Sequence, residues 1–264
     1  MLATLSGSTR IVPIVGDPIA QVKSPAGVTS AFAEQGENAV CVPMHIAAAD
    51  FSAFMQVVRL WQNCAGVIVT VPHKFAAFEA CDTASDRARF LRTVNTIRRS
   101  ANGRLHGDMF DGLGFVASCG DKGCEFDGRR ALLIGAGGAG TAIAHAVASA
   151  GVGLLGIADI DADRCEALVA RLVSAGFPVE VHPPDATGFE IVLNATPMGM
   201  RPGDRLPVSA AGFGATAFVG DVVTDPDPSA LIAAARAWGC RTSTGGDMFD
   251  KVRDLMVDFL LAGP

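Results

Sequence analysis

Three glycines at the spacing G-x-G-x-x-G are the residues of this chain best suited to holding a phosphate group. They are Gly135, Gly137 and Gly140, and they directly follow the apolar run 131–134. In such a turn the first glycine bends the chain, the second lets a pyrophosphate approach, and the third lets a helix pack on a strand. Exposed N–H groups and the positive dipole at the helix start would hold the anion. The motif predicts a dinucleotide site, with a purely structural turn as the alternative. Its predicted cofactor-binding residues are Gly135, Gly137, Gly138, Ala139 and Gly140.

The residues around these glycines complete a strand, turn, helix and second strand. Small and apolar residues continue at helical spacing to Ala150, and a second apolar run ends at Asp159. An acid at this place can accept the ribose 2′-hydroxyl of NAD and repels the 2′-phosphate of NADP. Asp159 therefore favours NAD, with NADP as the alternative cofactor. Arg164 could turn toward a phosphate, and Asp161 could serve only as a helix cap.

Lys74 is the titratable residue outside that unit that could do acid–base chemistry, and the chain has only four lysines. It follows the β-branched run 66–71 and Pro72-His73, at the end of a strand of the kind buried in parallel sheets. A desolvated lysine in a cleft can exchange a proton with a hydroxyl or a ketone. Considered alone, Lys74 also fits a solvated surface lysine. In the same way, Asp111 fits an acid making a local turn bond, and Asn95 a loop-binding amide.

The rest of the chain alternates predicted strands and helices, which is typical of an α/β fold. Glycine-rich segments at 107–114 and 245–246 are interpreted as hinges. We therefore expect a substrate domain of residues 1–111 plus 246–264 and a nucleotide domain of residues 112–245. The terminal helix 248–261 would pack back on the first domain, and the cleft between the domains is the expected site. A further helix is expected to begin at Ser24-Pro25, with Ser24 as its N-cap.

Composition limits the possible partners. Of 264 residues, 50% are hydrophobic and 18% are charged, and the net charge is −6. These values favour a folded core and argue against nucleic-acid or anionic membrane partners. No segment reaches the ~18 apolar residues of a membrane span, and no signal peptide is recognisable. The seven cysteines form no C-x-x-C pair, so we expect free thiols, a cytoplasmic location and no metal site.

Taken in order, the motifs resemble those of the shikimate/quinate dehydrogenase family along nearly the whole chain. The matching segments are GDPIAQVKSP (16–25), VTVPHK (69–74), VNT (94–96), GDMFDGLG (107–114), GAGGAG (135–140), NATPMGM (194–200) and GDMF (246–249). The resemblance implies two α/β domains, the second of Rossmann type. It also implies reversible, nicotinamide-dependent reduction of a 3-dehydroshikimate-like cyclic ketone to its alcohol.

The same resemblance implies roles for individual residues. Lys74 and Asp111 would form the catalytic proton-transferring pair. The substrate hydroxyls or carboxylate would be bound by Ser24, Thr70 and Asn95. In the NATPMGM segment we assign Asn194 and Thr196 to cofactor binding. The partner would be a small molecule, and the protein a monomer or a homodimer.

Several positions depart from the family pattern toward less polar side chains. A serine of the S-x-S-P motif is Val22, and an asparagine before the VPHK segment is Ile68. The Asn-Thr pair before the catalytic aspartate is Met109-Phe110, a glutamine of the last glycine-rich loop is Val252, and the tyrosine of D-x-x-Y is Thr224. Each hydrogen bond lost to a substrate costs about 1–3 kcal/mol. We therefore expect a less polar or differently substituted relative of shikimate to be the preferred substrate.

Two alternatives remain beside a shikimate-type enzyme. One is a non-catalytic cofactor- or metabolite-sensing protein on the same fold, and the other is a dehydrogenase of a related non-shikimate substrate. Retention of Lys74 and Asp111 argues against a sensor, because a binding protein needs no proton-transfer pair. The sequence leaves open whether Met109, Phe110 and Val252 line the pocket or pack behind it.

Overall fold

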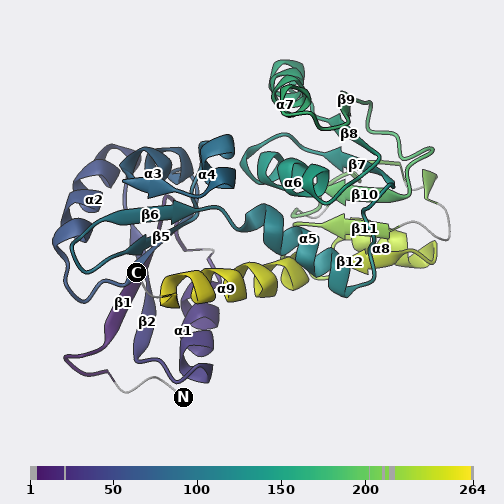
Figure 1. The fold of residues 1–264 in the computed structure, drawn as a ribbon. Coiled ribbons are helices and arrows are strands. Elements are labelled where there is room, and N and C mark those ends of the chain that lie inside the picture. The colour runs from purple at the N-terminus through teal and green to yellow at the C-terminus, as the bar shows by residue number, and fades with distance from the viewer. Residues whose placement is uncertain (1–4, 21, 202, 210–211, 214–217, 263–264) are drawn as a thin grey trace. The chain divides into compact units, whose positions relative to one another are not determined.

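The chain folds into two compact units in the computed structural model (Figure 1), which describes residues 5–20, 22–201, 203–209, 212–213 and 218–262. Unit 1 comprises Met1–Phe110 and Arg253–Pro264, and unit 2 comprises Asp111–Val252. The first boundary lies within a residue of the expected one, and the second falls inside the terminal helix α9 (Gly245–Leu261). The glycine pair 245–246 is the first turn of that continuous helix, so it is not a separate hinge segment.

Unit 1 is built on a six-stranded mixed sheet. Its strands are β1 (Arg10–Gly16), β2 (Ala39–His45), β3 (Gly66–Val69), β4 (Thr83–Ala84), β5 (Thr96–Arg99) and β6 (Leu105–Asp108). The order is β2-β1-β3-β5-β6-β4. Strands β2, β1 and β3 are parallel, whereas β5 is antiparallel to both β3 and β6. The predicted Asn102-Gly103 turn, with Gly103 at φ +81°, closes the hairpin of β5 and β6, so β6 runs antiparallel to β5.

Apolar side chains at strand and helix spacing form the core of unit 1. Its helices are α1 (Ser24–Glu34), the short 3₁₀ turn η1 (Ala48–Asp50), α2 (Phe51–Leu60), α3 (Lys74–Ala80) and α4 (Asp86–Leu91). Helix α2 buries Phe51, Met55 and Val58, which lie four and three residues apart on one face. All four residues of β3 are buried, as a continuous apolar run predicts. The second half of α9 belongs to this unit, where Arg98 donates to the carbonyls of Phe259 and Ala262. The expected return of the last helix to the first domain is confirmed.

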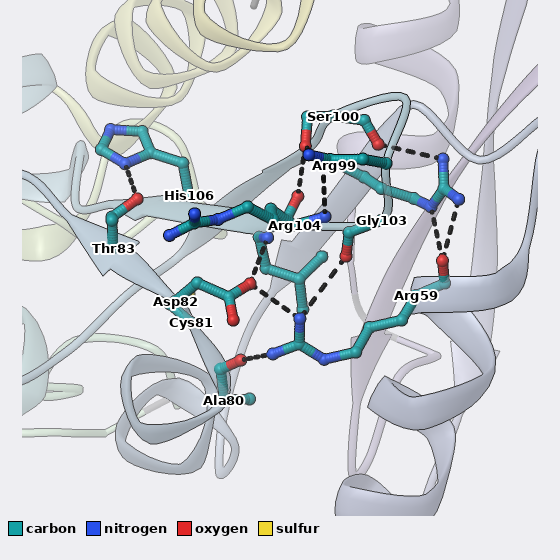
Figure 2. Close-up of polar contacts among 12 residues, drawn as sticks. Arg59, Ala80, Cys81, Asp82, Thr83, Arg99, Ser100, Gly103, Arg104 and His106 are labelled. Atoms are coloured by element: carbon teal, nitrogen blue, oxygen red, sulfur yellow. Dashed lines mark hydrogen bonds and ion pairs between the residues drawn. The ribbon is translucent and has the colours of Figure 1, made fainter.

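A polar network ties the end of α2 to the β5–β6 hairpin (Figure 2). The Arg59 guanidinium donates to the Asp82 carboxylate at 2.7 Å and to the Ala80 carbonyl at 2.8 Å. Asp82 also accepts the Leu105 N–H at 2.7 Å. Arg99 donates to the carbonyls of Val58 and Arg59, which end α2. The network therefore satisfies helix-end carbonyls that have no partner within the helix.

Unit 2 is a doubly wound sheet with six parallel strands. They are β7 (Arg130–Ile134), β8 (Leu154–Ala158), β9 (Val179–Val181), β10 (Ile191–Asn194), β11 (Phe218–Asp221) and β12 (Arg241–Ser243), in the order β12-β11-β10-β7-β8-β9. This is the strand order of the dinucleotide-binding Rossmann fold, so the predicted fold class is confirmed. The helices are α5 (Asp111–Asp121), α6 (Gly138–Ser149), α7 (Ala162–Ser174) and α8 (Ala230–Ala237). Among the described residues, no helix is long and apolar enough to cross a membrane.

Helix α5 takes up the second half of the segment 107–114 that the sequence presents as a hinge, and β6 includes its first two residues. Because glycine has low helix propensity, the sequence does not indicate a helix here, yet close packing requires these glycines. A Cβ on Gly112 would overlap the Ala142 carbonyl of α6, and a Cβ on Gly114 would overlap Val252 of α9. Lys122 pairs with Asp247 at 3.0 Å, and Lys251 pairs with Asp121 at 2.6 Å. These contacts fix α5 and explain why the first turns of α9 belong to unit 2.

Candidate active site

The glycine turn after β7 has the geometry that its spacing predicts. Gly135 has a φ of +107°, a conformation that side chains with a Cβ rarely adopt. A Cβ on Gly135 would also lie 2.9 Å from the Thr196 methyl carbon and 3.0 Å from the Ala195 carbonyl oxygen. A Cβ on Gly140 would overlap the Gly135 carbonyl oxygen. Both glycines are therefore required by the backbone itself.

The middle of the motif faces open space. Gly137 caps the amino end of α6, Gly138 is its first residue, and a Cβ on either would meet nothing within 4 Å. Ala139 follows in the first turn, half-buried. The first N–H groups of a helix have no partner within it and attract anions. An uncovered helix start behind a glycine turn fits the pyrophosphate of a dinucleotide.

Asp159, which directly follows β8, is tied to this turn. Its carboxylate accepts the Ala136 N–H at 2.5 Å, the Asp161 N–H at 2.9 Å and the Arg164 guanidinium at 2.6 Å. Burial raises the pKa of Asp159, but these three donors outweigh burial and hold the pKa below its usual value. The side chain is 5% exposed, whereas that of Arg164 is 47% exposed. Asp161 is the N-cap of α7, as one of the two sequence interpretations expects.

Asn194 and Thr196 shape a loop beside the glycine turn. The Asn194 amide oxygen accepts the Thr196 N–H at 3.0 Å and the Thr196 hydroxyl at 2.7 Å. The Asn194 amide nitrogen donates to the Asp221 carboxylate at 2.8 Å. Asn194 is completely buried, and burial raises the pKa of its partner Asp221. The structure thus gives Asn194 a role inside the loop, which the motif alone did not indicate.

In unit 1, three predicted residues gather at the carboxyl end of β3. Thr70 follows this strand, and its N–H donates to the Val15 carbonyl of β1 at 2.9 Å. Lys74 begins α3, and its carbonyl accepts the Val94 N–H at 3.0 Å. The Asn95 carbonyl accepts the Val69 N–H at 2.7 Å. Backbone pairing therefore brings Thr70, Lys74 and Asn95 together, although they come from separate stretches of chain.

The Asn95 side chain holds the segment that leads into α5. It is 3% exposed, and its amide oxygen accepts the Phe110 N–H and the Thr96 hydroxyl, both at 3.1 Å. Asp111, the next residue after Phe110, is buried at the start of α5. Asn95 is therefore more than a loop-binding amide, because it fixes the residue that precedes the predicted catalytic acid.

The prediction that Ser24 is an N-cap is wrong. The cap of α1 is Lys23, and the Gly27 N–H that a capping Ser24 would receive donates to the Lys23 carbonyl instead. Ser24 is the first helical residue, and it is buried. It ends the loop that leaves β1 at Gly16, and this loop meets the Thr70 region through the Asp17 N–H and the Val71 carbonyl.

The apolar departures from the family pattern pack into the protein interior. Met109, Phe110 and Val252 are 1%, 4% and 7% exposed. The Phe110 ring meets Phe259 edge-on at 5.3 Å between centroids, and the Arg87 guanidinium lies 5.1 Å from its centre. Ile68 is also buried, within β3. The question that the sequence leaves open is answered for these positions: their side chains are core.

The cysteines are thiols, as expected, and six of the seven are buried. Burial raises the pKa of Cys41, Cys81 and Cys124 to about 12, so these thiols are unreactive at neutral pH. Within the described ranges, no three His, Cys, Asp or Glu residues are placed to share a metal ion.

Comparison with known proteins places this arrangement in a family. Residues 14–97 match the family model described as the shikimate dehydrogenase substrate binding domain. The shikimate dehydrogenase (NADP(+)) of Rubrobacter xylanophilus is 36% identical over 247 residues, covering 91% of this chain and 87% of the relative. The chain belongs to the shikimate dehydrogenase family. It is accordingly an oxidoreductase of the type that acts on CH–OH groups with a nicotinamide cofactor.

Solved structures extend the comparison. The shikimate 5-dehydrogenase of Listeria monocytogenes, in complex with shikimate and NAD, is 26% identical with a TM-score of 0.91, covering 98% of this chain and 94% of that one. The 5-ketofructose reductase of a Gluconobacter species is 25% identical with a TM-score of 0.89, covering 97% and 94%. The same fold therefore occurs in proteins named for different substrates, shikimate and 5-ketofructose.

Proposed function

We propose that this protein reversibly reduces a 3-dehydroshikimate-like cyclic ketone to its alcohol with a nicotinamide dinucleotide. The observation that carries the proposal is the pairing of two features in one chain of this family. One is the glycine turn with its open helix start at Gly137 and Gly138. The other is Lys74, anchored at the carboxyl end of β3 beside Asn95. The nicotinamide ring, when bound, supplies or accepts the hydride.

Lys74 and Asp111 handle the proton in this proposal. Lys74 gives a proton to the ketone oxygen during reduction and takes it back during oxidation. Asp111, the first residue of α5, is the second member of this proton-transferring pair. The hydroxyls of Ser24 and Thr70 and the Asn95 amide bind the substrate's hydroxyl and carboxylate groups. A positioned acid–base group of this kind contributes about 10²–10⁴-fold in rate.

A related substrate with fewer polar groups is the second candidate. It is favoured by Val22, which leaves Ser24 as the single serine of its motif. Each missing hydrogen bond would weaken shikimate binding by about 1–3 kcal/mol. The preferred ketone would then lack one or more of the substituents of dehydroshikimate.

For the cofactor we propose NAD, with NADP used less well. The supporting observation is the buried Asp159 carboxylate, held ionised at the end of β8 by Ala136, Asp161 and Arg164. A negative group there disfavours a 2′-phosphate. The name of the Rubrobacter relative includes NADP(+), so this chain would differ from that relative in cofactor preference. Replacing Asp159 with Ser should raise the NADP-to-NAD ratio of kcat/KM, while an unchanged ratio would remove Asp159 from this role.

The test of the function is a nicotinamide absorbance assay of the purified protein. Shikimate, quinate and less polar analogues would each be run with NAD and with NADP, beside a Lys74→Met variant. We expect turnover with NAD that the variant loses while it still binds cofactor. Cofactor binding without turnover on any alcohol would favour the sensor instead. The thiols in the structure fit a reducing compartment, so we propose a cytoplasmic enzyme, monomeric or homodimeric.

A further inference from the structure

Asp221 is a buried carboxylate at the carboxyl edge of the unit 2 sheet, and no role above uses it. It ends β11 directly opposite Asn194, the last residue of β10, which in turn pairs with Ile134 of β7. Ile134 precedes the glycine turn, and its other neighbour Ala158 precedes Asp159. In spatial order, this edge of the sheet therefore carries Asp159, the glycine turn, Asn194 and Asp221.

The Asp221 side chain is completely buried and satisfied by neutral donors. One carboxylate oxygen accepts the Asn194 amide at 2.8 Å and the Val223 N–H at 3.1 Å. The other accepts the Ser229 hydroxyl at 2.5 Å. Among the residues the structure describes, no lysine or arginine pairs with Asp221. A carboxyl group without a cation is costly to bury, and an apolar residue would fill the same space at lower cost.

The bonds of Asp221 join three segments at one edge of the cofactor site. Asn194 carries the loop that includes Thr196, and this loop packs on the turn at Gly135. Ser229 is the N-cap of α8, where its hydroxyl accepts the Ile232 N–H at 3.2 Å. In a sheet of this order each half binds one mononucleotide, so the strands β10 and β11 serve the half opposite Asp159.

We propose that Asp221 is a positioning residue for the nicotinamide half of the cofactor, acting through Asn194 on the 195–198 loop. This inference rests on the proposed dinucleotide function. It assigns Asp159 and Asp221 to opposite halves of one ligand: Asp159 to the adenosine half and Asp221 to the nicotinamide half. The two acids should then respond differently to ligands that contain one half or both.

The experiment measures calorimetric dissociation constants of NAD and of ADP-ribose, which lacks the nicotinamide ring, for the wild type and two variants. Asp221→Asn keeps the shape of the side chain but replaces one acceptor with a donor. It should weaken NAD about tenfold and leave ADP-ribose within about twofold. Asp159→Asn, the matched control, should weaken both ligands by the same factor. Equal weakening of both ligands by Asp221→Asn, or no weakening of either, would overturn the assignment.

A second variant tests whether the effect of Asp221→Asn on NAD binding comes from misfolding alone. Ser229→Ala removes one donor to Asp221 and leaves the bond to Asn194 in place. It should shift NAD affinity in the same direction by a smaller factor, and the protein should remain folded with a modestly lower thermal unfolding midpoint because the cap of α8 is lost. An Asp221→Asn effect on NAD that Ser229→Ala does not share at all would overturn the network argument. A wild type that binds neither ADP-ribose nor NAD would overturn the proposed function together with this inference.

Discussion

The two units build their candidate sites from different materials. In unit 2 the cofactor site is largely main chain: a glycine turn, the amino end of α6 and the N–H groups that Asp159 and Asn194 engage. In unit 1 the candidate site is made of side chains from separate stretches of the chain, with Lys74 on α3 and Asn95 just before β5 as examples. A substitution in a site made of backbone disturbs it by steric overlap. A substitution in a site made of side chains removes a chemical group that the reaction needs.

The largest expected effect is on the side-chain site. Lys74→Met should lower kcat by about 10³-fold because the proposed proton donor is lost. The dissociation constant of NAD should stay within about twofold, since the glycine turn and the helix start proposed to hold the dinucleotide are unchanged in this variant. Steady-state kinetics and calorimetry check both values. Lys122→Met, which removes only a half-exposed ion pair, is the control and should keep full activity. Comparable activity of Lys74→Met and this control would rule out the proton-transfer role.

The next effect separates the two kinds of glycine in unit 2. Gly140→Ala places a methyl group on the Gly135 carbonyl and should destabilise the protein by about 3 kcal/mol. Gly137→Ala places its methyl in open space at a φ of −70°, so the free energy of unfolding should barely change. The same methyl should obstruct the pyrophosphate and weaken NAD about tenfold or more. Denaturant unfolding and calorimetry on both variants check this; equal stability of the two would contradict the packing argument.

The network that joins Arg59, Asp82 and the β5–β6 hairpin in unit 1 allows a pH test with an effect of moderate size. Hydrogen bonds from Arg59 and from the Leu105 N–H lower the pKa of Asp82, outweighing its burial. A lowered pKa means that the stabilisation is present above the unfolded value of about 3.9 and is lost as the pH falls through the folded value. Arg59→Met should cost about 1 kcal/mol at pH 7 and less at pH 3. Denaturant unfolding at both pH values measures this, and the same cost at each would show that packing alone is lost.

Sequence reasoning succeeded for the fold around the glycine turn. The spacing from Gly135 to Gly140, the flanking apolar runs and the acid at Asp159 are local signals, and local signals determine the turn, the helix and the two strands. It did not predict the hydrogen-bond partners of the side chains there. The hydrogen bond from the Ala136 N–H to Asp159 and the one from the Asn194 amide to Asp221 join residues far apart in the sequence, and the spacing of residue types gives no sign of them.

The candidate catalytic and substrate residues were found through family resemblance, because Lys74, Asn95 and Asp111 form no local pattern. Two local rules failed for physical reasons. Ser24 fits a cap by type, but the Lys23 carbonyl already receives the Gly27 N–H. The glycines of 107–114 look like a hinge, yet Gly107 lies in β6, and close packing against Ala142 and Val252 holds Gly112 and Gly114 in a helix. A local backbone bond decided the first case, and tertiary packing outweighed helix propensity in the second.

The smallest predicted effect concerns the left-handed backbone of unit 1. Gly103 takes this conformation as a glycine, whereas Arg92, with a side chain, has a φ of +54° where it ends α4. A residue with a Cβ is strained there by about 1 kcal/mol, and glycine is not. The pair between Arg92 and Glu79 offsets little, because both side chains are about two-thirds exposed.

Arg92→Gly should therefore stabilise the protein by about 0.5–1 kcal/mol, measured as a higher denaturant midpoint. Arg92→Ala is the matched control, because it removes the same ion pair and keeps the Cβ; it should be neutral or slightly destabilising. If the two variants instead unfold at the same midpoint, the strain at Arg92 is negligible. Activity should be unchanged in both, since Arg92 contacts none of the residues assigned to the site.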